Sequence, residues 1–357
     1  MIGQRLKVVR NAAGLSLREL AKRISNRVTA QAIGKYERDE SMPSSGVLIA
    51  IAKALGVSVD YLLSRHTFEL EALEFRKKAV ATRREEVQLE AEVIDRLDRY
   101  LTVEELLRAE SLEWVPPRGA PYPVREPADG ELAAERLRDV WGLGRDPIPT
   151  PGLAEYLEER GVKVLSAVLD DVHGSACWVR GPGNRRLPVI VMNERDTGER
   201  QRFTLAHEIG HIVMEVAGDE KTAERAAHRF SGAFLMPAAM LWAEVGRHRS
   251  SLSFGELFAL KRLFGVSVQA IVYRCKDLGI IDQTALQRYF KKFGQLGWRR
   301  PPYPEPAPLP REEPRRFRRL CYRALTEGAI SAAQAAEMLR ISVQDLNNEM
   351  DELPVPQ

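Results

Sequence analysis

The chain has 357 residues, 44% of them hydrophobic, and a formal net charge of +3 at pH 7. This length allows two or three domains, and the composition is ordinary for a globular protein in water. We find no run of about 18 apolar residues and no apolar signal segment at the start, so we expect a cytoplasmic protein with no membrane partner. The cysteines Cys177, Cys275 and Cys321 are odd in number and far apart. They are expected to be small core residues in a reducing compartment.

The first 65 residues are more basic than the rest of the chain. They contain eleven Lys and Arg residues against five Asp and Glu residues, whereas the remainder is slightly acidic. Glycine and proline residues separate five short amphipathic segments, which predict five short helices. Ser16 and Glu19 form the pattern of a capping box, and Thr29 can cap a third helix from Ala30 to about Glu37. A basic module of this kind indicates a polyanion partner.

This module resembles the Xre-type helix-turn-helix domain of phage and bacterial repressors. The resemblance rests on Leu15-Ser16-Leu17-Arg18-Glu19-Leu20-Ala21, on Ile33 to Arg38 and on Leu62-Leu63. In such domains the third helix enters the major groove of double-stranded DNA, and the helix before it crosses the phosphate backbone. The residues implied to contact DNA are Arg18, Arg27, Thr29, Ala30, Gln31, Lys35 and Arg38. Gln31 suits adenine, Lys35 suits guanine or a phosphate, and each arginine is either a phosphate contact or a solvated surface charge.

The stretch His207-Glu208-Ile209-Gly210-His211 sets two imidazoles four residues apart. On a helix of about 3.6 residues per turn, both project from one face and can share one Zn²⁺, while Glu208 lies about 100° round, beside the open position of the metal. Apolar residues from Phe203 to Val216 recur at helical spacing, which predicts that the helix packs against a core. The alternative is a surface helix with two solvated histidines.

A second helix is expected to begin after Gly218, because Asp219 and Glu220 favour a helix start. If this helix folds back, it can offer Glu224 as a third ligand and leave the fourth tetrahedral position for water, as catalytic zinc requires. His228 follows one turn later on the same face. It is an alternative third ligand, a hydrogen-bond partner of a ligand, a group that stabilises developing charge, or a half-buried structural histidine.

These residues resemble the ImmA/IrrE family of bacterial zinc metallopeptidases. The resemblance rests on Arg202 to His211, on Glu224 to Phe230 and on Phe234-Leu235-Met236-Pro237, and it extends to Asp277-Leu278-Gly279. Family members resemble thermolysin-type proteases in their core, and their characterised targets are transcriptional repressors. The resemblance implies His207, His211 and Glu224 as zinc ligands and Glu208 as general base. Many relatives carry another histidine four residues after the second ligand, where this chain has Glu215, so nothing that depends on that position is carried over.

The segments around these two modules are connectors and short strands. The stretch from Phe68 to about Leu107 is strongly charged, with apolar positions at helical spacing. It predicts a long helix or helical hairpin that either forms a coiled-coil homodimer seam or packs onto the peptidase. Three predicted strands are Val162–Leu165, Ala176–Val179 and Pro188–Met192. They are expected to form a small antiparallel sheet, with a hairpin turn at Gly181-Pro182-Gly183-Asn184. Six prolines between Pro301 and Pro310 predict a semi-rigid polyproline II spacer.

The expected fold is multidomain and mainly α, with a five-helix helix-turn-helix domain and a small α+β zincin-like metallopeptidase domain. The predicted boundaries are 1–65 for the helix-turn-helix domain, 66–112 for a helical connector, 113–130 for a Pro-rich linker, 131–285 for the peptidase, 286–312 for a second Pro-rich linker and 313–357 for a carboxyl-terminal helical module. This last module is interpreted as a docking or second sensory element.

The leading hypothesis is a DNA-binding transcriptional regulator fused to a zinc-dependent endopeptidase that cleaves a partner protein, such as a repressor or a toxin–antitoxin regulator. Glu208 would accept the proton of the attacking water and return it to the leaving amine. His228 and a tyrosine are the candidates for stabilising the oxyanion. A second hypothesis is a DNA-binding repressor or antitoxin whose zinc domain is a non-catalytic sensory or partner-binding surface. A third is a zinc amidase or another non-peptide hydrolase.

Overall fold

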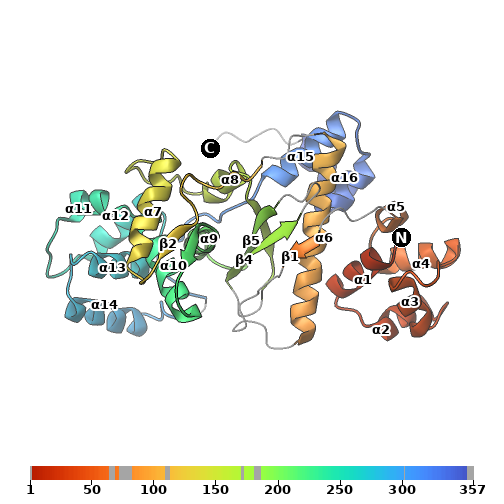
Figure 1. The fold of residues 1–357 in the computed structure, drawn as a ribbon, viewed down its shortest axis with the longest axis horizontal. Helices are drawn as coiled ribbons and strands as arrows, with labels where there is room; N and C mark the ends of the chain where they lie inside the picture. The colour runs from red at the N-terminus through yellow and green to blue at the C-terminus, as the bar shows by residue number, and fades with distance from the viewer. Residues whose placement is uncertain are drawn as a thin grey trace. The chain divides into compact units, whose positions relative to one another are not determined.

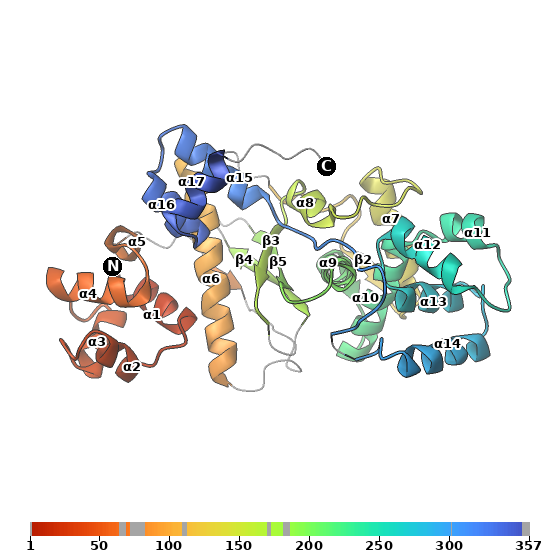
Figure 2. The same ribbon diagram turned by 180° about the vertical axis from the view of Figure 1, so that it is seen from behind.

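The computed structural model describes residues 2–63, 69–71, 83–108, 113–169, 173–180, 186–300 and 302–351. The chain divides into two compact units, which Figures 1 and 2 show from opposite sides. The first unit comprises residues 1–113, 177–187 and 315–357, and the second comprises residues 114–176 and 188–314. Within the described ranges, every helix is too short or too polar to cross a membrane.

The first unit begins with five helices, which confirms the five-helix prediction. They are α1 Gly3–Ala12, α2 Leu17–Arg23, α3 Ala30–Glu37, α4 Ser45–Leu55 and α5 Val59–Leu63, coloured red to orange in Figure 1. The capping box at Ser16 and Glu19 is present at the start of α2. At the start of α3, the Thr29 hydroxyl accepts a hydrogen bond from the Ala32 N–H. Apolar side chains from all five helices, including Leu6, Leu20, Ile33, Ile51 and Leu62, meet in one buried core.

The rest of the first unit is a long helix and the carboxyl-terminal module. The helices are α6 Arg83–Leu106, α15 Arg316–Thr326, α16 Ala332–Leu339 and α17 Val343–Asp351, and both views show α15 and α16 beside α6. The predicted long helix is therefore confirmed for 83–106, while residues 72–82 lie outside the described residues. Residues 69–71, expected to be helical, instead form β1 Glu69–Glu71, paired antiparallel with Trp178–Arg180. Pairing with a strand edge satisfies backbone groups of both segments and outweighs the local helical spacing.

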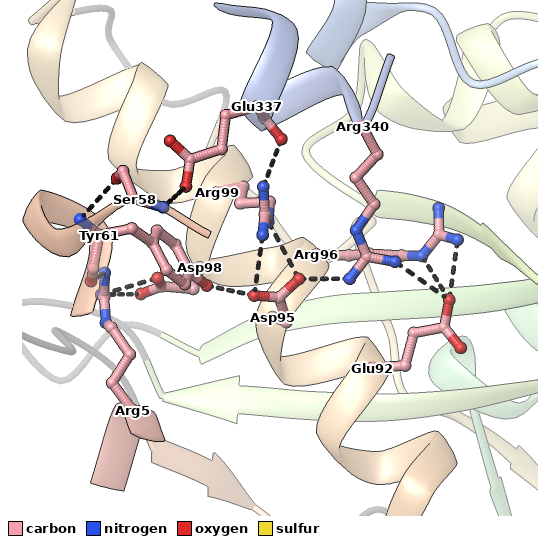
Figure 3. Close-up of polar contacts among 10 residues, drawn as sticks. All are labelled: Arg5, Ser58, Tyr61, Glu92, Asp95, Arg96, Asp98, Arg99, Glu337 and Arg340. Carbon is pink, nitrogen blue, oxygen red and sulfur yellow. Dashed lines mark hydrogen bonds and ion pairs between the residues drawn. The ribbon is translucent and has the colours of Figure 1, made fainter. Parts of the chain in front are cut away.

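Ion pairs link these parts of the first unit, as Figure 3 shows. Arg5 of α1 pairs with Asp98 of α6 at 2.7 Å, and both side chains are 2% exposed. The Arg5 guanidinium also donates to the Tyr61 carbonyl at 2.9 Å. At the other side of Tyr61, its hydroxyl donates to Asp95 of α6. Helices α1 and α5 are thus tied to α6 through one buried group of charges.

The same charges continue into the carboxyl-terminal module. Asp95 accepts from Arg99 at 2.9 Å and from Arg340, and the Glu337 carboxylate accepts from the Ser58 N–H at 2.6 Å (Figure 3). Burial disfavours the charged form of Asp95, but the two guanidinium groups outweigh burial and hold the pKa of that carboxyl below its ordinary value. The carboxyl-terminal helices therefore pack on α6 and on the start of α5.

The second unit contains a small sheet surrounded by helices. Its elements are β2 Tyr122–Val124, α7 Asp129–Val140, α8 Leu153–Glu158, β3 Lys163–Ala167, α9 Gly198–Val213, β6 Met214–Val216, α10 Glu220–Leu235, α11 Ala238–Val245, α12 Phe254–Phe264, α13 Val268–Asp277 and α14 Gln283–Gln295. Strands β4 Gly174–Arg180 and β5 Arg186–Asn193 contribute residues to both units. One buried apolar core runs through α7, α9, α10, α12 and α13. The predicted mainly α fold with a small α+β part is confirmed.

The sheet corrects the prediction of an antiparallel arrangement. The strand order is β1-β4-β5-β3, and β3 pairs with β5 in parallel, from Lys163 opposite Val189 to Ala167 opposite Asn193. After its first residue, β5 is buried along its whole length. A strand of this kind needs partners on both edges, so β5 takes a position between β4 and β3. The expected turn at 181–184 lies outside the described residues.

The helix that carries the two histidines ends earlier than its apolar spacing predicted. Helix α9 ends at Val213, and Met214–Val216 form β6, which pairs in parallel with β2. The Ala217 N–H then donates to the Val124 carbonyl at 2.8 Å. Strand β2 belongs to the expected linker 113–130, so part of that linker is packed structure. Pairing with β2 gives the backbone N–H and C=O groups of Met214–Val216 the hydrogen-bond partners that a longer α9 would have supplied.

The expected polyproline spacer also packs on the second unit. Helix α14 occupies the beginning of the predicted linker 286–312. The following residues 302–314, here called the strap, hold two buried carboxylates. Glu305 accepts from Lys261 at 2.8 Å and Glu312 accepts from Arg202 at 2.9 Å, with side chains 6% and 1% exposed. A Cβ at Gly198 would overlap the Pro310 carbonyl, so the strap lies directly against the first turn of α9. The prolines favour an extended, solvent-exposed spacer, but the buried ion pairs hold this segment against the second unit instead.

Candidate metal centre and nucleic-acid interface

Helices α9 and α10 approach each other closely at Gly210, the small residue between the two histidines of α9. A Cβ at this position would lie 2.9 Å from a ring carbon of Phe230, which is fully buried on α10. The turn between the helices is set by Gly218, with φ of 154°, and by Asp219, whose carboxylate accepts from the Thr222 N–H at 2.9 Å. The short turn and the missing side chain at Gly210 bring the first part of α10 back beside α9.

This packing brings three potential ligand side chains together. His207, His211 and Glu224 each offer an atom, and these atoms all lie within 4.8 Å of one another. The two Nε2 atoms are 3.1 Å apart, and Glu224 carboxylate oxygens lie 3.4 Å from His207 Nε2 and 3.8 Å from His211 Nε2. Tetrahedral zinc with bonds of about 2.0–2.1 Å requires ligand atoms about 3.3 Å apart. The three separations, two of which involve different oxygens of Glu224, lie close to this value, so the donor set fits one ion after small side-chain adjustments.

The group lies at the boundary between core and solvent. The side chains of His207 and His211 are 12% and 13% exposed, whereas Glu224 is 32% exposed. Glu208, next to His207 on α9, is buried with 7% exposure. The centre is thus open to solvent on the Glu224 side and closed on the α9 side.

His228 extends this centre along α10. Its ring centroid lies 4.8 Å from that of His207 and 5.7 Å from that of Phe203. His228 is exposed, so the structure disfavours the half-buried structural histidine that was one of its sequence interpretations. Because Glu224 closes the triangle with the two α9 histidines, His228 lies beside the group rather than within it.

Ion pairs with α7 and α13 hold the part of α10 around Arg229 in place. Arg229 pairs with Glu131 of α7 at 2.8 Å and with Asp277 of α13 at 3.2 Å. Arg274 pairs with the same Glu131 at 2.5 Å. Burial raises the pKa of Glu131, but the two arginines outweigh burial, so its net pKa lies below the ordinary value. The residues that hold α10 in place are thus on the face opposite the candidate ligands.

A cavity of about 260 Å³ begins beside His228. Its walls come from α9, α13 and the strap and include Phe203, Ala270, Tyr273, Tyr303 and Pro308. The sequence analysis missed the two tyrosines as site residues, although it left a tyrosine open as an oxyanion partner. One sequence signal could have indicated their role: the proline-rich stretch contains an aromatic residue, Tyr303, and an acidic residue, Glu305, and a simple spacer needs neither.

The residues expected to contact DNA are not equivalent in the structure. Gln31 and Lys35 are exposed one turn apart on α3, and Arg18 and Arg27 are exposed before it. Ala30 is half-buried, and the Thr29 hydroxyl caps α3. Arg38, at the end of α3, forms an exposed ion pair with Glu40 at 2.6 Å. Helix α3 thus presents Gln31 and Lys35 to solvent, while Arg38 just after it is paired with an acidic neighbour.

Comparisons with known proteins agree with both modules. The helix-turn-helix family model matches residues 6–62, and the model of the IrrE N-terminal-like domain, a peptidase family, matches residues 157–276. A protein of Rhodospirillum rubrum, named "Uncharacterized transcriptional regulator in ATPase CF(0) region", is 44% identical over 63 residues. This match covers 18% of the chain and 56% of that relative, so the chain spans about half the length of the curated relative it matches.

The fold and the comparisons together define the class of protein. The chain combines a helix-turn-helix domain with an IrrE-like, metallopeptidase-like domain, and this confirms the resemblances drawn from the sequence. Such a combination fits a regulator fused to a peptidase-like domain.

Proposed function

We propose that this protein is a cytoplasmic DNA-binding transcriptional regulator that carries a zinc-dependent endopeptidase and cleaves a partner protein of the repressor type. The observation that carries the proposal is the convergence of His207, His211 and Glu224 within 4.8 Å, on two helices that pack through Gly210. Two imidazoles and one carboxylate leave a fourth position for water, which is the ligand set of catalytic zinc. The match to a peptidase family supports the same chemistry.

The roles of the surrounding residues follow from their positions. Bound zinc would act as a Lewis acid on the scissile carbonyl and lower the pKa of water beside it. Glu208 accepts the proton of the attacking water and delivers it to the leaving amine, and its burial keeps bulk water from competing for that proton. His228 reaches the reacting carbonyl from α10 and donates a hydrogen bond to the negative charge that develops there.

The amino-terminal module delivers this chemistry to promoters. Gln31 and Lys35 contact base edges or phosphates in the major groove, with Ala30 against the bases and Thr29 shaping the helix start. Arg18 and Arg27 contact phosphates, and Arg38 does so after release from Glu40. One module would bind double-stranded DNA and the other would bind a repressor-like protein. The protein could then cleave a repressor at the promoter to which it is bound.

The central test is Glu208→Gln in the full chain. Purified protein with one equivalent of zinc is incubated with candidate repressors, beginning with any encoded beside it, and fragments are followed by mass spectrometry. We expect unchanged zinc content and a loss of cleavage of about 10²–10⁴-fold, because only the base is removed. The matched control is Glu215→Gln, an exposed carboxylate on β6. Cleavage by Glu208→Gln at the parent rate would refute the mechanism.

The non-catalytic alternative makes a different prediction for the double variant His207→Ala/His211→Ala. If the centre cleaves a partner, this variant loses proteolysis and keeps the DNA affinity of the parent. If the centre is a sensory surface, the parent shows no proteolysis and the variant changes DNA binding alone.

A further inference from the structure

The cavity beside the metal centre is large enough for one side chain and too small for a folded segment. Its volume is about 260 Å³, whereas a dry protein cavity of about 150 Å³ holds a benzene ring. Phe203, Ala270, Tyr273 and Pro308 give it mainly apolar walls. An uncharged aliphatic or aromatic group is therefore the occupant that gains most from entering it.

The cavity is continuous with the candidate reaction centre. His228 lines it, and the same ring lies 4.8 Å from His207. A peptide held with its scissile carbonyl at the centre would therefore have a neighbouring side chain beside the cavity.

Two carboxylates line the cavity, Glu199 and Glu305, and both are already paired with a buried cation. Lys261, with a fully buried side chain, lies 2.6 Å from Glu199 and 2.8 Å from Glu305, and Glu305 also accepts from the Val268 N–H at 2.9 Å. A basic substrate side chain would have to compete with Lys261 for these carboxylates, which disfavours it. The same contacts hold the strap against α12 and α13 between Tyr303 and Pro308.

From these observations we propose that the cavity is the specificity pocket for a leucine, methionine or phenylalanine side chain adjacent to the cleaved bond, with the strap as its outer wall. This rests on the proposed peptidase function. In this proposal the strap helps to select the substrate sequence.

The test fills the cavity without touching the metal centre. Ala270→Phe, on α13, adds a ring into the space, and Ala239→Phe, an exposed alanine on α11, is the matched control. The probes are quenched-fluorescent peptides built on the cleaved sequence and varied only beside the scissile bond, as Ala, Leu, Phe or Lys. We expect the parent and Ala239→Phe to prefer Leu or Phe over Ala by about 10–200-fold in kcat/KM, and Ala270→Phe to reduce that ratio to about one. Zinc content should be equal in all three.

A binding measurement separates this inference from the proposed reaction. The same peptides, labelled for anisotropy, are titrated into zinc-loaded Glu208→Gln with and without Ala270→Phe; where no cleaved sequence is known, peptides of randomised flanking sequence replace them. Tighter binding of Leu and Phe peptides that disappears with Ala270→Phe supports the pocket even if no variant cuts. Equal preferences with and without Ala270→Phe, in cleavage or in binding, overturn it while leaving the peptidase proposal intact.

Discussion

Glu312, in the strap, offers the sharpest test of how the second unit is held together. Its side chain is 1% exposed and lies 2.9 Å from the Arg202 guanidinium, which is also 1% exposed. Its other carboxylate oxygen accepts from the N–H groups of Gly152 and Ala154, both at 3.0 Å, at the start of α8. One carboxylate thus joins the strap, α8 and the histidine-bearing helix α9.

Glu312→Ala should lower the free energy of unfolding of the second unit by about 4–6 kcal/mol. Removing one partner of a buried ion pair costs about 3–5 kcal/mol, because Arg202 stays buried without its counter-ion. A buried N–H without an acceptor costs about 1–3 kcal/mol, and we count only a part of this cost for the two N–H groups that lose Glu312. Glu312→Gln keeps an acceptor oxygen but loses the charge, so we expect about half of that loss. Glu313→Ala, an exposed neighbour, should change stability by less than about 0.5 kcal/mol.

Urea unfolding followed by tryptophan fluorescence suits this measurement. Four of the five tryptophans, Trp114, Trp141, Trp242 and Trp298, lie in the second unit, so the signal reports mainly on that unit. With a slope of about 2–3 kcal/mol per molar urea, Glu312→Ala should move the midpoint down by about 2 M. A shift no larger than that of Glu313→Ala, or equal shifts for the Ala and Gln variants, would refute the reasoning.

Two further predictions concern the first unit. Arg340→Ala should lower its stability by about 1–2 kcal/mol near neutral pH, at the low end for a charge-assisted hydrogen bond because Arg340 is 38% exposed. The pKa of Asp95 is held below its ordinary value, so this stabilisation is fully present above the unfolded pKa of about 3.9 and is lost as pH falls through the folded pKa. The difference in urea midpoint between parent and variant should therefore be smaller at pH 3 than at pH 7, because pH 3 lies below the unfolded pKa. A gap of equal size at both pH values would contradict the prediction, and Arg323→Ala, in an exposed pair, is the control. On DNA selected from a random library, Gln31→Ala should relax preference at one base pair at a cost of about 1–3 kcal/mol, whereas Arg27→Ala should weaken all sequences alike and lower the salt slope by about 1. Uniform weakening by Gln31→Ala would count against its contact with a base.

Much of the helical structure could be predicted because its signals are local. The predicted capping residues Ser16 and Thr29 each form the expected hydrogen bond with a backbone N–H three residues ahead, and Asp219, predicted to favour a helix start, does the same. The spacing of His207 and His211 likewise places both on one face once the segment is helical. Their role as ligands, with that of Glu224, stays a prediction, and so do the DNA contacts and the domain boundaries.

The failures lie where a segment finds its partner far along the chain. Glu69–Glu71 became a strand because β4 offered an edge, and Met214–Val216 left α9 to pair with β2. The strap looked like a spacer because prolines favour extended chain, and its Glu305 and Glu312 pair with cations 44 and 110 residues away. Periodicity and propensity carry no information about such partners.

Local residue patterns were sufficient for the amino-terminal helices, the helical histidine motif and the two family resemblances, because hydrogen bonds and side-chain directions within a few residues follow from residue type. Packing was needed to bring Glu224 against the imidazoles, to place β5 between β4 and β3, and to close the cavity beside His228 with the strap. These features depend on which buried charges and strand edges meet across the fold, and that choice is made by the free energy of the whole packed unit.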